Sequence, residues 1–536
     1  MRHLYNLSFA LALSIILLGA NQLFTWVEPR FQFSFNLNRL WGYFIFFFFL
    51  SYVPRGKFTK SVYGFILMGS FAEMVHLSFF GSLIFPIGFF LAFTQVGEIS
   101  QALLEVLEVL IWPVLFLLFS IVGIYFASRT LGRKTRQHRW MLGLVIFLLL
   151  FAPLRSLINH DSFGKRPDSG ATAFYNFYAS LTYFSVEIGP RLVSGDQPRD
   201  PVTPFPPVLR PGAAQNLVVI LGESINLNHM SLYGYPKSTT PFLESLQNQP
   251  GFFKEKGVAC GVSTDVAVPL LINGLCSPGA MPQIVSTNSC LFRLAKTNGY
   301  QTWFMTAQAG DSTKGILNYL CPKYIDHFYH PQNLIEDAGY YTHLKDMELV
   351  EILDRVDWSK KNFILLQQRS SHTPYGENYP KSMERFPKIK GERTSEKVIR
   401  TYDNSLAYSD EFFKRTIEKV LAKSPGPVMF LLTSDHGEAM GEGGRFGHLR
   451  LFKEQYMVPW LFYQSGGGEW VSRLQEAKRP LSHVDFHRLA AGILGYEWKG
   501  FTPQEKTMVL GTDIFGYAGY LRLLLQKQGI KELSRH

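Results

Sequence analysis

Residues 428–438 read VMFLLTSDHGE, and this stretch decides the fold of the second half of the chain. Its apolar run is typical of a buried strand and breaks directly into Asp435 and His436. A second apolar run, NLVVILG at 216–222, ends in Glu223 and Ser224. Ligand-binding groups of open α/β sheets gather at the carboxyl ends of the strands. We therefore expect both carboxylates to converge on one sheet edge, where a cation can neutralise them.

The rest of the C-terminal half alternates apolar runs with helical patterns. This alternation predicts an α/β domain, with a mostly parallel sheet and helices on both faces. Further strands are expected at 299–308, 362–368 and 458–464. Helices are expected at 240–248, 284–297, 344–355, 397–423 and 481–494.

The N-terminal third carries five apolar segments, each close to the length of about 20 residues that spans a bilayer. They lie at 7–27, 39–53, 62–80, 108–128 and 140–157. Lys and Arg gather in the loops that lie inside if the N-terminus is cytoplasmic, which places the chain after about residue 158 outside. We expect a five-helix transmembrane domain at 1–157, a linker with an interfacial helix at 158–215, and an external domain at 216–536. The broken apolar segment 81–107 is expected to be interfacial or re-entrant.

Composition narrows the function further. The net charge is +11, but no dense basic run with interleaved aromatics occurs, so we expect no nucleic-acid partner. All four cysteines lie in the expected external part, which predicts two disulfides. Spacing favours Cys260–Cys276 and Cys290–Cys321, while the other two pairings remain open.

Two adjacent hydroxyls mark a second feature, within ACGVSTDVAVPLLING at 259–274. Ser263 and Thr264 precede an apolar helical run, and exposed amides at a helix N-terminus favour phosphate. A hydroxyl beside a divalent metal becomes a better nucleophile. Oxygen ligands with one imidazole suit Zn²⁺ or, less well, Mn²⁺. The alternative is structural: Thr264 caps its helix, and the Asp-His pair forms a capped turn.

The order of several motifs resembles the membrane phosphoethanolamine transferases. These belong to the alkaline phosphatase and sulfatase superfamily, and their best-known members modify lipid A. The similarity runs through most of residues 216–465. The strings that carry it are NLVVILGESINLNHMSLYGYPKSTTPFLESL, ACGVSTDVAVP, SSHTPYGENYP, TYDNSLAYSDEFF and SDHGEAMGEGGRFGHLR.

The resemblance implies roles for individual residues. Glu223, Asp435, His436 and the hydroxyl of Thr264 would form a zinc site, and the family's Cys-Gly-x-x-Thr spacing makes Thr264 the nucleophile. Three further side chains would contact the substrate or its phosphate, the two histidines alternatively a second zinc: His372, His448 and Lys314. Each of these three could instead be a solvated loop residue.

The chain departs from the family at its cysteines. Leu270 stands where the family has a Cys shortly after the nucleophile, and the later cysteine pairs of the lipid A enzymes are missing. These departures bear on the acceptor more than on the chemistry. The string CSPGA at 276–280 is close to the sulfatase signal but has Ala280 in place of Arg, so we expect no sulfatase activity.

The implied function is zinc-dependent transfer of phosphoethanolamine from phosphatidylethanolamine through a covalent threonine intermediate. The acceptor would be lipid A, the lipopolysaccharide core oligosaccharide or a periplasmic glucan. The protein would be embedded in the bacterial inner membrane by several passes, with its C-terminal domain periplasmic. The alternatives are a glycerol phosphate transferase like the lipoteichoic acid synthases, a hydrolase, and a non-catalytic envelope scaffold.

Overall fold

The computed structural model describes most of the chain, and its contacts divide the chain into two compact units. The first contains Met1–Phe93, Leu103–Asp196 and Gly443–Gly447, and the second contains the remainder. Each unit is described by itself. The described residues are 2–27, 37–80, 84, 89, 92, 110–159, 172–188, 190, 214–278, 280, 283–284, 288–309, 316–317, 319–336, 342–466, 468–477, 479–496, 503–512, 514 and 519–535.

The first unit is helical. It contains α1 (Arg2–Val27), α2 (Leu37–Tyr52), α3 (Lys57–Phe80), α6 (Ile111–Thr130), α7 (Met141–Asn159) and α8 (Ala173–Tyr183). Helix α1 contacts α2 and α6, and α3 contacts α8. Apolar side chains from several helices, including Leu13, Phe47, Ile66 and Val145, form a common buried core.

Helices occupy all five predicted apolar segments, but the five-span count is not confirmed. Among the described residues, two helical stretches are long and apolar enough to cross a membrane, namely Arg2–Val27 and Ile111–Lys134. Helix α2 has 16 residues, and α7 has Pro153 inside it. The predicted interfacial segment 81–107 lies almost wholly outside the described residues, as does most of the linker 158–215. A helix, α8, lies in the part of the linker where an interfacial helix was expected, and its location at a membrane interface stays a prediction.

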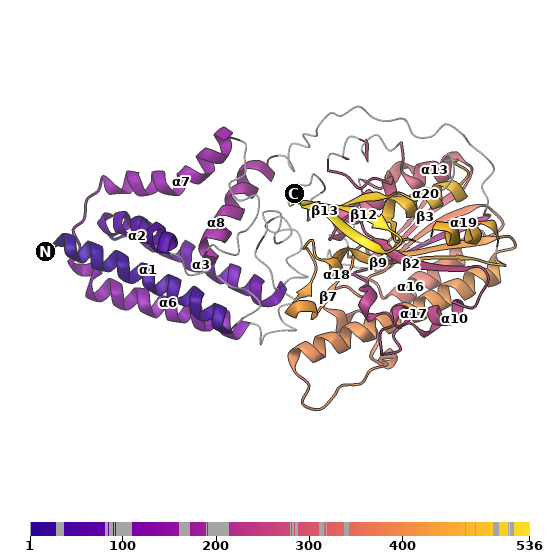
Figure 1. The fold of residues 1–536 in the computed structure, drawn as a ribbon, viewed down its shortest axis with the longest axis horizontal. Helices are drawn as coiled ribbons and strands as arrows, with labels where there is room; N and C mark the ends of the chain where they lie inside the picture. Colours follow the sequence, from indigo (N-terminus) through magenta and orange to yellow (C-terminus); the bar gives the residue numbers. More distant parts are fainter. Residues whose placement is uncertain are drawn as a thin grey trace. The chain divides into compact units, whose positions relative to one another are not determined.

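The second unit is built on an eight-stranded sheet with the order β10-β2-β9-β6-β1-β5-β3-β4 (Figure 1). Seven strands run parallel to one another, and β9 alone within this sheet is antiparallel to its neighbours β2 and β6. The predicted parallel core is therefore confirmed, with one reversed strand. The strands are β1 (Asn216–Gly222), β2 (Phe252–Val258), β3 (Gln301–Thr306), β4 (His327–Tyr329), β5 (Asn362–Gln367), β6 (Val428–Ser434), β9 (Met457–Gln464) and β10 (Leu481–Ser482).

Helices cover both faces of this sheet (Figure 1). One face carries α11 (Thr264–Asn273), α13 (Leu291–Thr297), α19 (Glu469–Ala477) and α20 (His483–Ile493). The other carries α10 (Pro241–Leu246), α16 (Asp346–Ile352) and α17 (Thr394–Lys423). Every residue of β1, β5 and β6 is buried, as expected for strands covered on both sides.

Several elements were not predicted. Strand β2 reads FFKEKGV. A search for uninterrupted apolar runs does not find it, because charged residues occupy its centre. The end of the chain adds an antiparallel sheet of β11 (Lys506–Leu510), β12 (Tyr520–Gln526) and β13 (Gly529–Arg535).

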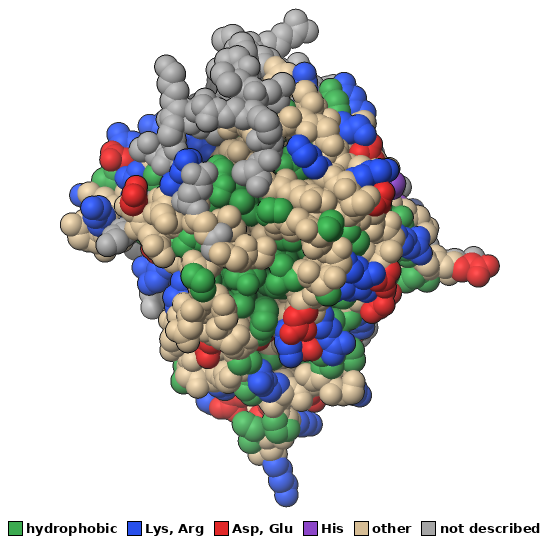
Figure 2. Space-filling model, turned by 90° about the vertical axis from the view of Figure 1, so that its right-hand side faces the viewer, with side chains coloured by type: hydrophobic (Ala, Val, Ile, Leu, Met, Phe, Trp, Pro, Cys, Tyr) green, Lys and Arg blue, Asp and Glu red, His purple; other side chains and the backbone are tan. Residues whose placement is uncertain are grey.

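On the face drawn in Figure 2, basic and acidic side chains are interspersed around a hydrophobic centre.

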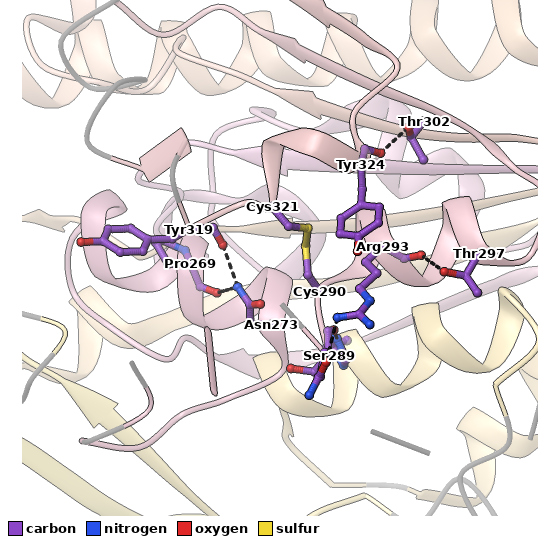
Figure 3. Close-up of a disulfide and its surroundings, with 12 residues drawn as sticks. Pro269, Asn273, Ser289, Cys290, Arg293, Thr297, Thr302, Tyr319, Cys321 and Tyr324 are labelled. Carbon is purple, nitrogen blue, oxygen red and sulfur yellow. Dashed lines mark hydrogen bonds between the residues drawn. A yellow bond between two sulfur atoms is a disulfide. The ribbon is translucent and has the colours of Figure 1, made fainter. Parts of the chain in front are cut away.

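Both expected disulfides are present, Cys260–Cys276 and Cys290–Cys321, so the pairings favoured by spacing are confirmed. The second joins the start of α13 to the segment before β4 (Figure 3). Nearby, the Asn273 side chain donates to the carbonyls of Pro269 and Tyr319, both at 2.9 Å. The bridge therefore lies against the end of α11, the helix that Thr264 begins.

Replacing both Cys290 and Cys321 with Ala should lower the free energy of unfolding by about 2–4 kcal/mol, because a cross-link over this separation restricts the unfolded chain. Thermal unfolding of the solubilised chain without reductant measures the loss. As a control, reductant that removes the Cys260–Cys276 bridge should destabilise the variant further. An unchanged melting temperature in the variant would contradict the prediction.

Candidate active site

The site begins where two neighbouring strands end. Strands β1 and β6 are adjacent and parallel, and Gly222 is paired with Ser434. The next residues, Glu223 and Asp435, therefore leave the sheet side by side. Both are almost fully buried, with 2% and 1% of their surfaces exposed. The predicted convergence of two carboxylates on one sheet edge is what the backbone register produces.

Thr264 and His436 complete the cluster. The Thr264 hydroxyl donates to Asp435 Oδ2 at 2.7 Å and lies 3.4 Å from both Glu223 Oε2 and His436 Nε2. His436 Nε2 is 3.7 Å from Glu223 Oε1 and 3.5 Å from Asp435 Oδ2. The structure thus brings all four sequence-predicted metal-site residues together.

The two adjacent hydroxyls have separate positions. Ser263 is the N-cap of α11, where it makes no side-chain cap bond, and Thr264 is the first residue of the helix. Ser263 Oγ is buried without a hydrogen-bond partner in the described part of the chain. The hydroxyl at the carboxylates therefore belongs to Thr264, at the N-terminal end of a helix, where the dipole favours an anion.

Local backbone geometry orients His436. Its Nδ1 hydrogen-bonds the Gly437 carbonyl at 2.9 Å, which leaves Nε2 facing Thr264. Gly437 cannot carry a side chain, because a Cβ there would lie 2.3 Å from the carbonyl oxygen of Glu454. The glycine of the SDHGE string is thus required by close backbone packing.

Burial makes the electrostatics of the two carboxylates unequal. Burial, followed by the charge of Asp435, raises the pKa of Glu223 well above its ordinary value. Burial also opposes ionisation of Asp435, but the His436 ring, the Thr264 hydrogen bond and the backbone N–H groups of Ser224 and His436 together outweigh it and lower the pKa of Asp435. Two buried carboxylates in contact are costly unless a cation neutralises them.

The donor set fits a divalent transition metal. Glu223, Asp435 and His436 offer ligand atoms that all lie within 4.8 Å of one another. Two carboxylates, one imidazole and a hydroxyl make four donors, the number in closed zinc sites, and the imidazole disfavours Mg²⁺ and Ca²⁺. The residues present therefore fit the predicted zinc.

A second group of donors adjoins the first through His436. Its members are His436, Glu438 and His448. His448, one of the predicted phosphate-contacting histidines, hydrogen-bonds Glu438 Oε2 through Nδ1 at 2.7 Å, and its ring centroid is 4.3 Å from that of His436. The Tyr375 hydroxyl donates to Glu438 Oε1. The buried Glu438 carboxylate thus fixes the ring of His448.

Of the remaining two predicted substrate residues, His372 and Lys314, the structure describes only His372. His372 is half-buried in the turn after β5, at the same sheet edge, and its carbonyl accepts from the Asn378 side chain. Its role as a phosphate contact stays a prediction. Lys314 lies outside the described residues.

Three residues near the site were not predicted. Gln308 follows β3 and donates to Glu223 Oε2 at 2.7 Å. Glu438 lies within the SDHGE string itself, and Tyr402 lies on α17. Gln308 is the last residue of the strand expected at 299–308, so a search for polar residues at strand ends, the signal that selected Glu223 and Asp435, could have found it. No local pattern marks Tyr402, because a buried Tyr on an apolar helix face is ordinary.

The sequence pattern of the sulfatase family matches residues 215–496, more than half of the chain, so the protein belongs to the sulfatase family. Cys276 is bonded to Cys260, and Thr264 is the first residue of α11. The absence of sulfatase activity stays a prediction.

Two relatives show which proteins of this family the chain is similar to. The chain is 25% identical over 309 residues to the Kdo(2)-lipid A phosphoethanolamine 7''-transferase of Escherichia coli (strain K12), covering 52% of this chain and 51% of the relative. It is 28% identical over 267 residues to the phosphatidylethanolamine transferase Mcr-1 of Escherichia coli, covering 46% and 48%. The predicted resemblance to phosphoethanolamine transferases is confirmed. The chain matches only about half the length of these relatives.

One solved structure matches nearly the whole chain. It is the integral membrane protein lipooligosaccharide phosphoethanolamine transferase A (EptA) from Neisseria meningitidis, with a TM-score of 0.58 and 16% sequence identity. The match covers 92% of this chain and 95% of that one. At this identity it shows a common fold.

Tyr402 supports the turn that carries Glu223. Ser224, the next residue, has φ 54°, a left-handed conformation that is unfavourable for serine. The Tyr402 hydroxyl donates to the Ser224 carbonyl at 2.6 Å and accepts from the Asn226 N–H at 2.7 Å. Ser224 N–H donates to Asp435 Oδ1 at 3.0 Å. These bonds hold the turn in place between the two strands.

Tyr402→Phe should therefore reduce the free energy of unfolding by about 1–3 kcal/mol, because it leaves a buried carbonyl and a buried N–H without their partner. Tyr463→Phe, a half-buried tyrosine on β9, is the matched control and should cost much less. Thermal unfolding of wild type and the two variants measures these losses. Equal melting temperatures for wild type and Tyr402→Phe would show that the two Tyr402 hydrogen bonds do not contribute to stability.

Proposed function

We propose that the protein transfers phosphoethanolamine from phosphatidylethanolamine to an envelope glycolipid or glycan, through a phosphorylated Thr264. One observation carries the proposal: the Thr264 hydroxyl lies at a helix N-terminus within hydrogen-bond reach of Asp435 and beside Glu223 and His436. The names of the relatives support the transferred group and a lipid A type of acceptor. The core oligosaccharide and a periplasmic glucan are the other candidates.

Glu223, Asp435, His436 and Thr264 would hold Zn²⁺, with Mn²⁺ a poorer fit. When bound, the ion supplies positive charge to the phosphoryl oxygens and lowers the pKa of the threonine hydroxyl. The chain's own groups do the rest: Asp435 Oδ2 accepts the Thr264 hydrogen bond, and the helix N-terminus favours the phosphate.

The reaction would proceed by two displacements. Thr264 Oγ1 gives up its proton and attacks phosphorus, the bond to the diacylglycerol oxygen breaks, and that oxygen takes up the released proton as diacylglycerol leaves. An acceptor hydroxyl or phosphate oxygen then attacks the same phosphorus and restores the Thr264 hydroxyl. His448, whose Nδ1 hydrogen-bonds Glu438, would move protons at Nε2, and His372 and Lys314 are the further candidates for phosphate contact.

The helical N-terminal unit would embed the protein in the bacterial inner membrane by several passes, with residues 216–536 in the periplasm. The structural relative from Neisseria meningitidis is an integral membrane protein, and this supports the placement. A lipid donor requires an active site with access to the bilayer, which accounts for joining these two units in one chain.

Substituting the nucleophile should separate the two hydroxyls. Thr264→Ala should abolish transfer, because no other hydroxyl donates to Asp435 Oδ2 among the described residues. Ser263→Ala should retain near-normal transfer, because Ser263 Oγ makes no cap bond. Incubation with phosphatidylethanolamine followed by peptide mass spectrometry should locate phosphoethanolamine on Thr264. A modified Ser263, or turnover by Thr264→Ala, would place the chemistry elsewhere.

Product analysis should distinguish the proposal from its alternatives. With labelled phosphatidylethanolamine and an envelope extract, wild-type protein should release diacylglycerol and label a glycolipid or glycan, and Thr264→Ala should do neither. Diacylglycerol released from phosphatidylglycerol alone would indicate a glycerol phosphate transferase. Free phosphoethanolamine without a labelled acceptor would indicate a hydrolase, and no reaction at all a scaffold.

A further inference from the structure

The Gln308 side chain links Glu223, in the proposed metal site, to the residues that follow β5. Its side-chain amide donates to Glu223 Oε2 and to the Gln368 carbonyl, both at 2.7 Å. Its side-chain oxygen accepts from Arg369 Nη1 at 3.0 Å. Both N–H groups and the oxygen of the amide are therefore engaged. A flipped amide would put its oxygen against two acceptors and its nitrogen against a guanidinium donor, so only one orientation fits.

Arg369 is unusual for its burial. Its surface is 2% exposed, and it is among the largest fully buried side chains of the described residues. A buried guanidinium is costly unless its surroundings are polar or oppositely charged. Its charge also favours the ionised form of Glu223. This cation lies one amide away from the Glu223 carboxylate of the proposed metal site.

A buried carboxylate fixes the backbone that carries Arg369. Asp346, the first residue of α16, accepts from the N–H of Arg369 at 2.8 Å, the Ser370 N–H at 3.3 Å and the Gln368 side chain at 2.9 Å. Asp346 is 1% exposed. The turn after β5 is thus anchored independently of the metal site, which gives the Arg369 side chain a fixed origin.

The Glu223 carboxylate is held from two sides. Ser224 Oγ donates to Oε1 at 2.7 Å, and Gln308 donates to Oε2 at 2.7 Å. Each oxygen keeps a further lone pair for a cation. Hydrogen bonds of this kind set the plane of a ligating carboxylate and hence the position of its free lone pairs.

We propose that Gln308 and Arg369 are positioning residues that fix the Glu223 carboxylate as a metal ligand, with Arg369 acting through Gln308. The inference rests on the proposed zinc site. It assigns a role to two residues outside the four that would hold the ion, and it predicts an order of action: Arg369 sets the orientation of the Gln308 amide, and that amide sets the orientation of Glu223.

Zinc affinity of the full-length, detergent-solubilised chain tests this order. Metal is removed with EDTA, and zinc is titrated against a chromophoric chelator. Gln308→Leu should weaken zinc binding by about 10- to 100-fold, the usual effect of losing a hydrogen bond to a ligating residue. Arg369→Met should weaken it by a smaller factor. Because Arg369 acts through Gln308, the double variant should bind zinc as Gln308→Leu does, within about twofold.

Two matched controls separate positioning from general damage. Gln367→Leu removes another buried glutamine, one that pairs with Thr306 at 3.1 Å. Arg400→Met removes a buried arginine that pairs with Glu392 at 2.9 Å. Both should keep wild-type zinc affinity, although Arg400→Met should lower the melting temperature measured in EDTA. Arg369→Lys, which keeps a donor for the Gln308 oxygen, should recover most of the affinity lost in Arg369→Met.

The outcomes are distinct. Wild-type zinc affinity in Gln308→Leu, or losses from the two single variants that add in the double variant, would overturn the inference. Should Gln308→Leu fail to fold, Gln308→Asn keeps the amide but shortens its reach by one methylene, and it should show the same weakening. A wild-type chain that binds no zinc would instead overturn the zinc site of the proposed function.

Discussion

The structure around the site depends on one constraint, which is the burial of two adjacent carboxylates. Glu223 and Asp435 leave neighbouring parallel strands at the same level, and neither retains useful access to water. Like charges repel strongly in such an environment, so the arrangement is stable only with a proton or a cation between them. Neighbouring backbone and side-chain groups supply hydrogen bonds that compensate part of this cost.

Each of the two carboxylates accepts hydrogen bonds from backbone N–H groups or neutral side chains. Asp435 Oδ1 accepts the backbone N–H groups of Ser224 and His436, and Oδ2 is left for Thr264. Glu223 accepts from Ser224 Oγ and Gln308. Backbone and neutral side-chain donors hold the carboxylates without neutralising them. In the proposed function a metal ion would supply the missing positive charge at a carboxylate pair that these bonds already hold in place.

The sequence predicted those parts of the structure that are determined by neighbouring residues in the chain. Strands β1 and β6 follow from uninterrupted apolar runs, and the strand-end rule then placed Glu223 and Asp435 together. The reversed direction of β9 was not predictable, because a strand buried on both faces reads the same in either direction. Gln308 and Tyr402 act through partners far away in the chain, and only tertiary packing brings them to the turn after β1. The choice of Thr264 rather than Ser263 as the proposed nucleophile needed the family spacing, and in the structure the Thr264 hydroxyl donates to Asp435.

The position of Thr264, the proposed nucleophile, is set from both ends of the segment that carries it. The Cys260–Cys276 bridge closes a loop around α11, so the helix start cannot drift far from the sheet. His483 then joins two sides of the site: its Nδ1 accepts from the Cys260 N–H at 3.3 Å, and its Nε2 bonds to the Ser434 carbonyl at 3.0 Å. Accepting at one nitrogen and donating at the other requires a neutral ring, and burial lowers the pKa of His483 to about 4. A covalent bridge and a neutral histidine thus tie the strand that bears Asp435 to the loop that leads to Thr264, which is how two segments distant in sequence keep a 2.7 Å contact.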